Sequence, residues 1–195
     1  MFQNSITTAI LYQMTITPTK IEDLFILEPK VIGDARGYFM ESYKKDWFKK
    51  HFSGIEFIQD NESQSQKGVL RGLHFQLPPY AQTKLVRVIQ GEVLDVAVDL
   101  RKESPTYGEH VSVILSAENK KQFFLPRGFA HGFIVLSETA IFSYKVDNTY
   151  SPKNDSGILW KDPGLNIDWM LRPEYIQLSE KDQNLPPLKN FNSPF

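Results

Sequence analysis

A histidine and a lysine interrupt the apolar stretch of residues 69–100, and both residue types can carry acid–base chemistry. Side chains alternate along an extended strand, so His74 and Gln76 share one face of the first segment. Lys84 follows in the next segment, in phase with Val86. Such a pair indicates a polar site that lines an apolar cavity. A hydrogen-bonded core histidine and a solvent-facing lysine fit the same pattern.

The chemistry that suits His74 is general-base catalysis, because an imidazole titrates near neutral pH. A carboxylate bonded to the ring would fix its tautomer and stabilise the imidazolium. The chain offers several carboxylates, and spacing alone does not choose among them. Tyr144 is in phase with Phe142 and Val146 in a later apolar stretch. Its hydroxyl could donate a proton, or it could be a core tyrosine with an ordinary hydrogen bond.

A metal site is the main chemical alternative in a small β-barrel. A common ligand pattern there is His-x-His with a downstream Glu and a further His. Here Gln76 stands at the second position of the pair, and no carboxylate lies between Gln76 and Lys84. His131 alone matches the later histidine. His51 and His110 lie among charged residues near expected element ends and are interpreted as surface residues. We therefore expect no metal and no other cofactor.

The elements that must position these residues are short strands. Pro-Pro and Gln-Gly divide residues 69–100, which predicts three antiparallel strands joined by a longer loop and a tight turn. Residues 55–59 predict a further strand, and residues 60–68 a polar loop. Helix is expected only over residues 44–51 and in a turn capped by Ser179. Many short strands with little helix are typical of an all-β sandwich or barrel.

Composition limits the class of protein. The length of 195 residues fits one domain, which we expect over residues 14–195, with residues 1–13 as an extension outside its core. The net charge is −1 with interspersed signs, so no nucleic-acid partner is expected. The absence of cysteine excludes disulfides and thiol nucleophiles. No signal peptide or membrane-length apolar run is found, and we expect a cytoplasmic protein without a membrane partner.

Seven stretches with a common pattern occur in this order: DARGYFMESY, QDNESQS, VLRGLHFQ, KLVRVIQGEVLDVAVDLRKESPTYG, LPRGFAHGF, YKVDNTYSPKNDSGILW and LSEKDQNLP. Together they resemble the dTDP-4-dehydrorhamnose 3,5-epimerase family of the cupin superfamily, over about residues 15–190. The resemblance implies an all-β, cupin-type jelly-roll β-barrel with a few short peripheral helices. It also implies a metal-free isomerase. Its reaction, in dTDP-L-rhamnose biosynthesis, would convert dTDP-4-dehydro-6-deoxy-D-glucose to dTDP-4-dehydro-L-rhamnose by epimerisation at C3 and C5.

The resemblance assigns roles to four catalytic residues. His74 matches the family's base, and Asp182 matches the carboxylate that pairs with it. Tyr144 matches the proton donor on the other side of the sugar ring. Lys84 matches the cation that stabilises the enolate oxygen, a role that needs preorganised charge in a dry site.

Substrate-binding residues are implied in the same way. Arg36, Arg71 and His131 match groups near the diphosphate, where guanidinium groups suit phosphate oxygens. Tyr150 matches an aromatic residue that stacks on the nucleotide.

Three further groups of residues complete the implied site. Phe39 and Glu41 match a strand that, with Arg36, reaches the site of a neighbouring subunit, so a homodimer with strand exchange is expected. Gln59, Asp60 and Asn61 match a polar wall near the nucleotide. Asp155 and Lys181 match two further ligand contacts. Asp95 and Asp99 are left as structural or supporting candidates.

Two other functions stay open from the sequence. One is a related nucleotide-sugar 3-epimerase, 5-epimerase or ketoisomerase that makes another deoxysugar, since spacing does not show which carbons are reached. The other is a cupin that binds a small molecule without catalysis, or with a metal.

Overall fold

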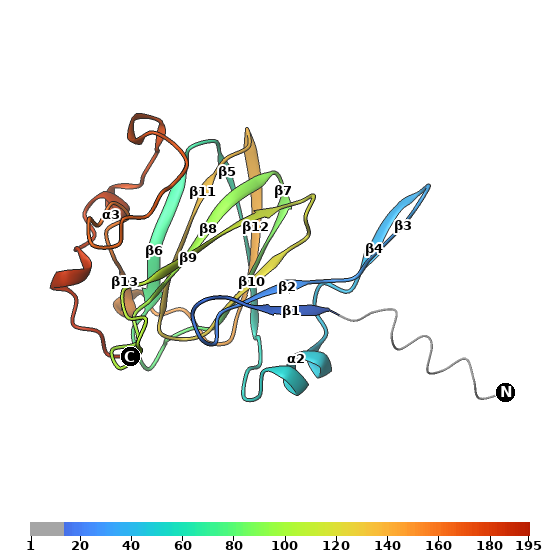
Figure 1. The fold of residues 1–195 in the computed structure, drawn as a ribbon, viewed down its shortest axis with the longest axis horizontal. Helices are drawn as coiled ribbons and strands as arrows, with labels where there is room; N and C mark the ends of the chain where they lie inside the picture. The colour runs from blue at the N-terminus through green and yellow to red at the C-terminus, as the bar shows by residue number, and fades with distance from the viewer. Residues whose placement is uncertain (1–13) are drawn as a thin grey trace.

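Strands form most of the regular structure in the computed structural model, which describes residues 14–195 (Figure 1). The predicted extension of residues 1–13 lies outside the described residues. In chain order the elements are β1 Thr15–Pro18, β2 Phe25–Glu28, β3 Val31–Asp34, β4 Gly37–Met40, α2 Lys45–His51, β5 Gln59–Gln66, β6 Leu70–Gln76, β7 Lys84–Gln90, β8 Glu92–Asp99, β9 His110–Ser116, β10 Gln122–Leu125, β11 Phe129–Val135, β12 Thr139–Val146, β13 Asp155–Gly157 and α3 Glu180–Gln183. Three short 3₁₀ turns cover Pro152–Asn154, Pro173–Tyr175 and Leu188–Asn190.

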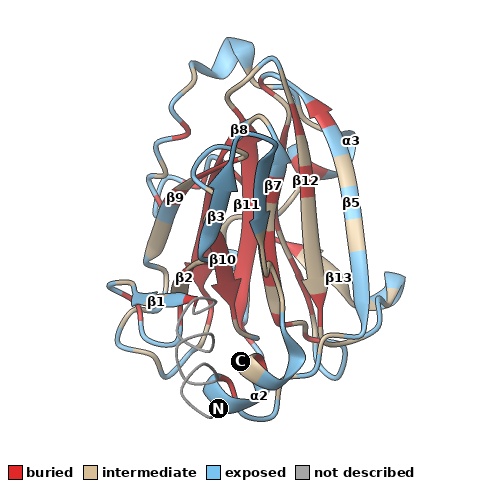
Figure 2. Ribbon diagram, turned by 90° about the vertical axis from the view of Figure 1, so that its right-hand side faces the viewer, coloured by how far each residue is buried: buried red, intermediate tan, exposed pale blue. Residues whose placement is uncertain are grey.

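Two antiparallel sheets face each other and form the predicted all-β jelly roll. One sheet has the strand order β1-β2-β10-β7-β12-β5, and the other has the order β13-β6-β11-β8-β9. The buried strands of both sheets lie at the centre of the molecule, as the red ribbons of β8, β10 and β11 show (Figure 2). The space between the sheets therefore holds the main core and, at one end, the candidate site.

Strand β8 shows why the alternating pattern holds this fold together. Leu94 and Val96 pack outward, in a cluster covered by the chain after residue 158. Val93 and Ala97 point inward, in the core between the sheets. The alternation of side chains along β8 thus produces two faces, and both carry apolar side chains because both are covered.

The three strands predicted within residues 69–100 do not all lie in one sheet. Three strands are present, but β7 belongs to one sheet while β6 and β8 lie in the other, on either side of β11. The chain changes sheets between β7 and β8 at Gly91, which has a φ of +78°. A Cβ at this glycine would lie 2.1 Å from the Thr139 carbonyl oxygen. The single residue between β7 and β8 thus connects the two sheets rather than closing a hairpin.

The assignment of residues 55–68 is also corrected. The strand is β5, at Gln59–Gln66, in the segment for which a polar loop was predicted, and residues 55–58 form no strand. Ile55 and Phe57 instead pack against the cluster beneath α2. Helix α2 lies close to its predicted range, and its Phe48 is 1% exposed on the outer face of the β7 sheet.

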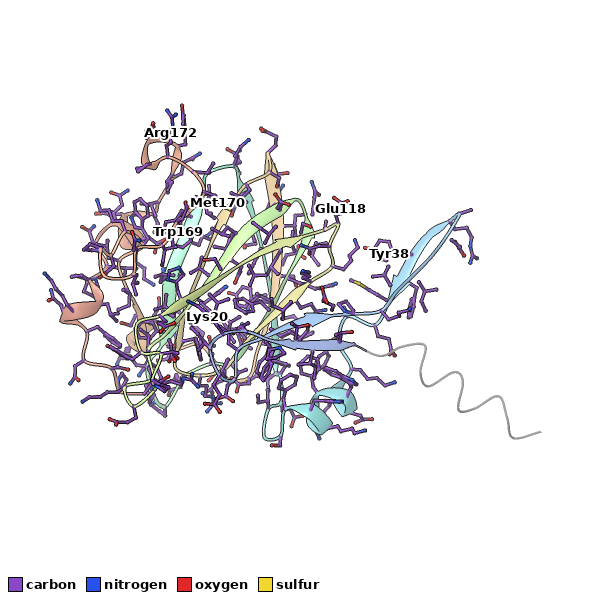
Figure 3. The ribbon with its side chains drawn as sticks, viewed as in Figure 1. Lys20, Tyr38, Glu118, Trp169, Met170 and Arg172 are labelled. Carbon is purple, nitrogen blue, oxygen red and sulfur yellow. The ribbon has the colours of Figure 1, made fainter. Side chains whose placement is uncertain are left out.

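A hairpin formed by β3 and β4 projects away from the two sheets (Figure 1). Its strands pair only with each other among the described strands. Apolar side chains on this hairpin are open to solvent, and Tyr38 and Phe39 are 57% and 58% exposed. Lys120 donates a hydrogen bond to the Tyr38 hydroxyl at 3.0 Å. Figure 3 labels Tyr38 on this hairpin and Glu118, two residues before Lys120 in the chain.

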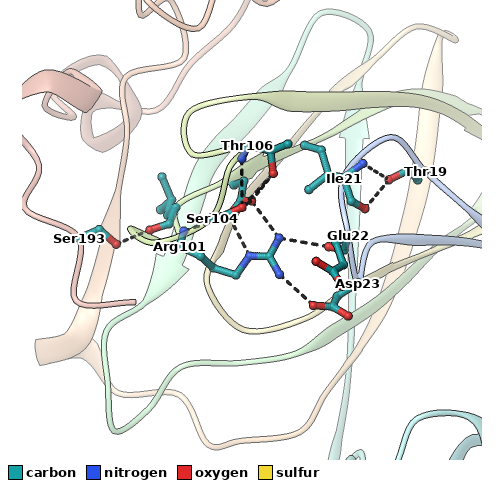
Figure 4. A network of polar contacts seen from close by, with 10 residues as sticks. Thr19, Ile21, Glu22, Asp23, Arg101, Ser104, Thr106 and Ser193 are labelled. Atoms are coloured by element: carbon teal, nitrogen blue, oxygen red, sulfur yellow. Dashed lines mark hydrogen bonds and ion pairs between the residues drawn. The ribbon is translucent and has the colours of Figure 1, made fainter.

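A network of hydrogen bonds and ion pairs joins three segments that are far apart in the sequence (Figure 4). The fully buried carboxylate of Asp99 accepts hydrogen bonds from Arg101, Ser104 and Thr106. Arg101 also reaches Asp23 at 2.9 Å. Asp99 thus has a structural role, because a buried charge is tolerated only when it is paired and hydrogen-bonded. Across residues 14–195, no helix is long and apolar enough to cross a membrane.

Candidate active site

A cavity of about 530 Å³ opens between the two sheets. Its walls come from β5, β6, β7, β11 and β12, and from the segment that runs into α3. Seven residues predicted from the sequence line it: Arg71, His74, Lys84, His131, Tyr144, Lys181 and Asp182. The four predicted catalytic residues therefore share one cavity.

His74 and Asp182 form a direct pair in this cavity. The Nε2 atom of His74 lies 2.5 Å from Oδ1 of Asp182, and the Asp182 side chain is 4% exposed. Burial acts to raise the pKa of Asp182, but hydrogen bonds from His74 and at Ser179, with the nearby Lys181 charge, lower it overall. An ionised carboxylate only accepts hydrogen bonds, so Nε2 must donate. In neutral His74 the lone pair is then on Nδ1, which is the nitrogen able to act as a base.

Local structure places Asp182 for this contact. Ser179 caps α3 as predicted, and its Oγ accepts a hydrogen bond from the Asp182 backbone N–H at 3.1 Å. Such a cap fixes the first turn of a helix, because the first N–H groups have no partner within the helix. The carboxylate is therefore held by its own backbone as well as by His74.

Lys84 lies on the opposite sheet, at the start of β7, and faces the same cavity. Its ammonium group makes no hydrogen bond or ion pair with any residue of the described part of the chain. Burial lowers its pKa to about 8, although the charges of Asp95 and Asp155 act in the opposite direction. At neutral pH the ammonium is therefore mainly charged, and its three N–H groups are available to a ligand.

Tyr144 lies on β12, beside β7, so it also faces His74 from the opposite sheet. Its hydroxyl has no hydrogen-bond partner within residues 14–195. Burial raises the pKa of Tyr144, and the charge of Arg71 opposes this shift. The phenol is therefore protonated at neutral pH and able to donate.

Asp155 connects two predicted binding residues near the cavity. Lys181 forms an ion pair with Asp155, and the Tyr150 hydroxyl donates to the same carboxylate at 3.1 Å. Gln76 donates to the other carboxylate oxygen of Asp155 at 3.3 Å. Since Lys181 precedes Asp182 in α3, this cluster also anchors the helix that carries the partner of His74.

The other predicted binding residues lie outside the cavity wall of a single chain. Arg36 lies in the projecting hairpin and pairs with Asp34, while Phe39 is on the same hairpin and Glu41 follows it. Gln59, Asp60 and Asn61 lie on β5. Asn61 lies directly opposite Tyr144 in the strand register, and Asp60 pairs with Lys145 at 2.6 Å.

Sequence reasoning missed several residues of the cavity wall. Glu62 and Ser63 were hidden because their segment was predicted to be a loop. Phe133 and Phe142 stack at 4.1 Å between their ring centroids. Phe142 shares the alternating pattern of Tyr144, so that pattern could have placed it in the wall.

No cluster of three metal-ligating side chains is present among His, Asp and Glu of the described residues. In particular, Gln76 is engaged in hydrogen bonds with Asp155 and with the Ser151 backbone. The expectation of metal-free chemistry stays a prediction for experiment.

The chain matches known proteins over nearly its whole length. The sequence profile of the dTDP-4-dehydrorhamnose 3,5-epimerase family covers residues 18–190. A dTDP-4-dehydrorhamnose 3,5-epimerase from Shigella flexneri is 56% identical over 172 residues, which span 88% of this chain and 94% of the relative. A dTDP-4-dehydrorhamnose 3-epimerase from Streptomyces niveus is 37% identical over 157 residues, 80% of this chain and 76% of the relative.

The fold comparison agrees with the sequence comparison. A crystal structure of dTDP-6-deoxy-D-glucose-3,5-epimerase from Legionella pneumophila, in complex with dTDP-4-keto-L-rhamnose, has a TM-score of 0.89 and 50% identity to this chain. It covers 92% of this chain and 95% of its own. The resemblance inferred from the seven stretches is confirmed, and this chain belongs to the dTDP-4-dehydrorhamnose 3,5-epimerase family of isomerases.

Proposed function

We propose that this dTDP-4-dehydrorhamnose 3,5-epimerase uses His74 as its base, Tyr144 as its acid and Lys84 as the partner of the enolate oxygen. The C4 ketone of dTDP-4-dehydro-6-deoxy-D-glucose acidifies the hydrogens on C3 and C5. His74 takes one of these protons, and the C–H electron pair forms the enolate, whose charge rests on the C4 oxygen. Tyr144 then protonates the same carbon from the other face and so inverts it. Once His74 has released its proton to solvent and Tyr144 has regained one, the cycle repeats at the second carbon.

The observation that carries this proposal is the placement of acid and base on facing sheets. His74 and its partner Asp182 lie on the side of β6, whereas Lys84 and Tyr144 lie on neighbouring strands of the other sheet. A sugar ring between the sheets would meet the base on one face and the donor on the other. Inversion requires this arrangement, because a single group on one face would return the proton to where it came from.

The nucleotide part of the substrate would bind at the positively charged side chains of the cavity wall. Arg71 lines the cavity, where Ser65 accepts from its Nε at 3.1 Å and so orients the guanidinium. Lys181 adds a second positive charge. We propose that they bind the diphosphate, with Tyr150 stacking on the base, as guanidinium groups and aromatic rings suit these ligands.

We further propose a homodimer in which the β3–β4 hairpin of one subunit completes the site of the other. Within one chain, Arg36 and Phe39 do not line the cavity. They lie on a hairpin that projects from the sheets and carries exposed apolar side chains. An exposed strand pair of this kind is usually covered by a partner.

We also propose the predicted cytoplasmic location, which cell fractionation would test.

The decisive experiment is incubation of the enzyme with dTDP-4-dehydro-6-deoxy-D-glucose in D₂O, followed by NMR. Deuterium at both C3 and C5 of the product is expected. Deuterium at C3 alone would instead support a 3-epimerase, the activity named for the Streptomyces niveus relative. Metal analysis of the active protein tests the remaining alternative, since stoichiometric iron, zinc or manganese would contradict metal-free chemistry.

The role of His74 is tested by His74→Asn, with His51→Asn as a matched control. His51 is exposed and bonds only to the Trp47 carbonyl among polar groups of the described chain. A general base contributes on the order of 10²–10⁴-fold, so His74→Asn should retain less than about a hundredth of the turnover. The control should keep full activity. Retention of more than about a tenth by His74→Asn would exclude it as the base.

A further inference from the structure

A second histidine–carboxylate pair lies directly beside the first. In the register of β6 and β11, His131 is the partner of His74. The Nε2 atom of His131 lies 3.0 Å from Oδ1 and 2.9 Å from Oδ2 of Asp95, which is fully buried. The resemblance assigned His131 to the diphosphate, but its Nε2 is engaged at the floor of the cavity. This pair has no part in the mechanism derived above.

Asp95 depends on His131 for its hydrogen bonding. Across residues 14–195, His131 is the only donor to its carboxylate. Burial raises the pKa of Asp95 and lowers that of His131, while the contact between them opposes both shifts. A buried carboxylate with one neutral donor still carries a charge that needs balance. The positive charge that balances Asp95 must therefore come from a cation that also faces the space between the two sheets.

Lys84 is that cation. Its strand β7 and the β8 strand of Asp95 both point side chains into the core between the sheets, as Val86 and Val93 show. The charge of Asp95 acts on Lys84, and that of Lys84 on Asp95, yet no ion pair joins them. The carboxylate instead turns both oxygens to His131.

Other charged groups also face Lys84 and have to be considered. From β13 and α3 come Asp155, which supports its charge, and Lys181, which opposes it. These two are already paired with each other. The rest of the cavity is lined by Tyr144, Arg71, His74, Asp182 and Glu62, from β12, β6, α3 and β5. Strand β10, which pairs with β7 beside Lys84, has the uncharged sequence QFFL. Of the two carboxylates whose charges support that of Lys84, Asp155 is paired with Lys181, whereas Asp95 has no lysine or arginine partner in the described chain.

We propose that Asp95 and His131 are positioning residues that act through Lys84. His131 holds the carboxylate of Asp95 away from the ammonium, so that Asp95 balances the charge of Lys84 through space. The ammonium then keeps all its N–H groups for the substrate oxygen. Without His131, the carboxylate would pair with Lys84 directly and occupy the groups that the enolate needs. This inference rests on the proposed role of Lys84 and adds two residues to it.

Two variants should move the pKa of Lys84 in opposite directions. Asp95→Asn keeps the shape but removes the charge, so the pKa of Lys84 should fall by roughly one unit. At pH 8 the protonated fraction would then drop about fivefold, and the alkaline limb of the turnover profile would move to lower pH. His131→Leu removes the donor, so Asp95 should pair with Lys84 and raise its pKa while turnover falls. His131→Gln restores a donor and should restore the pKa.

The measurement is an NMR titration of free enzyme that carries ¹³C,¹⁵N-labelled lysine, with Lys84→Gln to assign the signal. It needs no turnover, so it separates this inference from the proposed function. If both variants lower the pKa of Lys84, or neither changes it, the inference is wrong. If the pKa shifts as expected but Lys84→Gln keeps full turnover, the catalytic role of Lys84 is wrong instead. If His131→Leu fails to fold, Asp95→Asn and His131→Gln still test the inference. A pKa of Lys84 in Asp95→Asn equal to that in the unsubstituted enzyme would overturn it.

Discussion

Replacing Asp182 with asparagine should disable the base while leaving its surroundings in place. The two side chains have the same shape, and Asp182 is 3% exposed, so a larger change would disturb packing. The backbone N–H of residue 182 would still donate to Ser179 and hold α3. Only the charge and the hydrogen-bonding character of one buried group would change.

The expected loss follows from the 2.5 Å contact between Asp182 and Nε2 of His74. An amide can donate its N–H to Nε2, and the imidazole would then carry its proton on Nδ1. The nitrogen that should accept the substrate proton would be blocked, and the imidazolium would lose its counter-charge. Loss of general-base catalysis is on the order of 10²–10⁴-fold, which corresponds to about 2.7–5.4 kcal/mol in the activation barrier. The corresponding aspartate-to-asparagine change in a serine-protease triad costs about 10⁴-fold, so the upper part of this range is expected.

The assay is the rate of deuterium entry at C3 and C5 in D₂O, combined with ¹⁵N NMR of the His74 ring. Glu180→Gln, an exposed carboxylate in the same helix, is the matched control and should change neither quantity. The rate in Asp182→Asn should fall while the ring signal moves to the Nδ1–H tautomer. An unchanged tautomer with a fall in rate of less than about tenfold would refute the reasoning, because Asp182 would then neither orient nor charge the base.

Three other predictions address the acid, the partner and the scaffold. Tyr144→Phe should still exchange deuterium into the sugar but give little inversion, since His74 would return a proton to the same face; equal loss of both would remove Tyr144 from the mechanism. Light scattering at micromolar concentration should show a dimer, and Arg36→Ala should raise KM for the dTDP-sugar; a fully active monomer would defeat this. Asp99→Asn should lower the free energy of unfolding by about 1–3 kcal/mol in urea denaturation without changing turnover, and an unchanged stability would show that its network contributes little.

Strand alternation alone was sufficient to place much of this site. The phase of Lys84 with Val86, and of Tyr144 with Phe142, put these side chains on the inner face, where the cavity lies. Apolar neighbours with the same parity are buried, so the polar member of the series must face the same interior. This pattern left open the choice between a core residue and a site residue. The Tyr144 hydroxyl has no hydrogen-bond partner among residues 14–195, which favours the site.

The carboxylate partner of His74 could not be found in this way. Asp182 lies 108 residues from His74 in the chain, and the local signal at Ser179 predicted only a helical turn. Whether that turn docks on β6 depends on the path of the whole C-terminal segment across the outer face of the sheet. Resemblance to a family supplied the pairing because related chains share that path, whereas spacing within one sequence does not contain it.

The error at β5 has its cause in the cavity itself. Strand prediction searches for alternation between apolar and polar residues, because one face is normally buried against an apolar core. The inner face of β5 carries Asn61, Ser63 and Ser65, and Ser63 lines the cavity that also holds His74 and Lys84. Both faces of the strand are therefore hydrophilic, although Ser65 is only 6% exposed and burial still alternates along most of the strand. A strand that lines a site for a charged ligand loses the pattern by which strands are recognised, so sequence reasoning fails first where the protein binds its substrate.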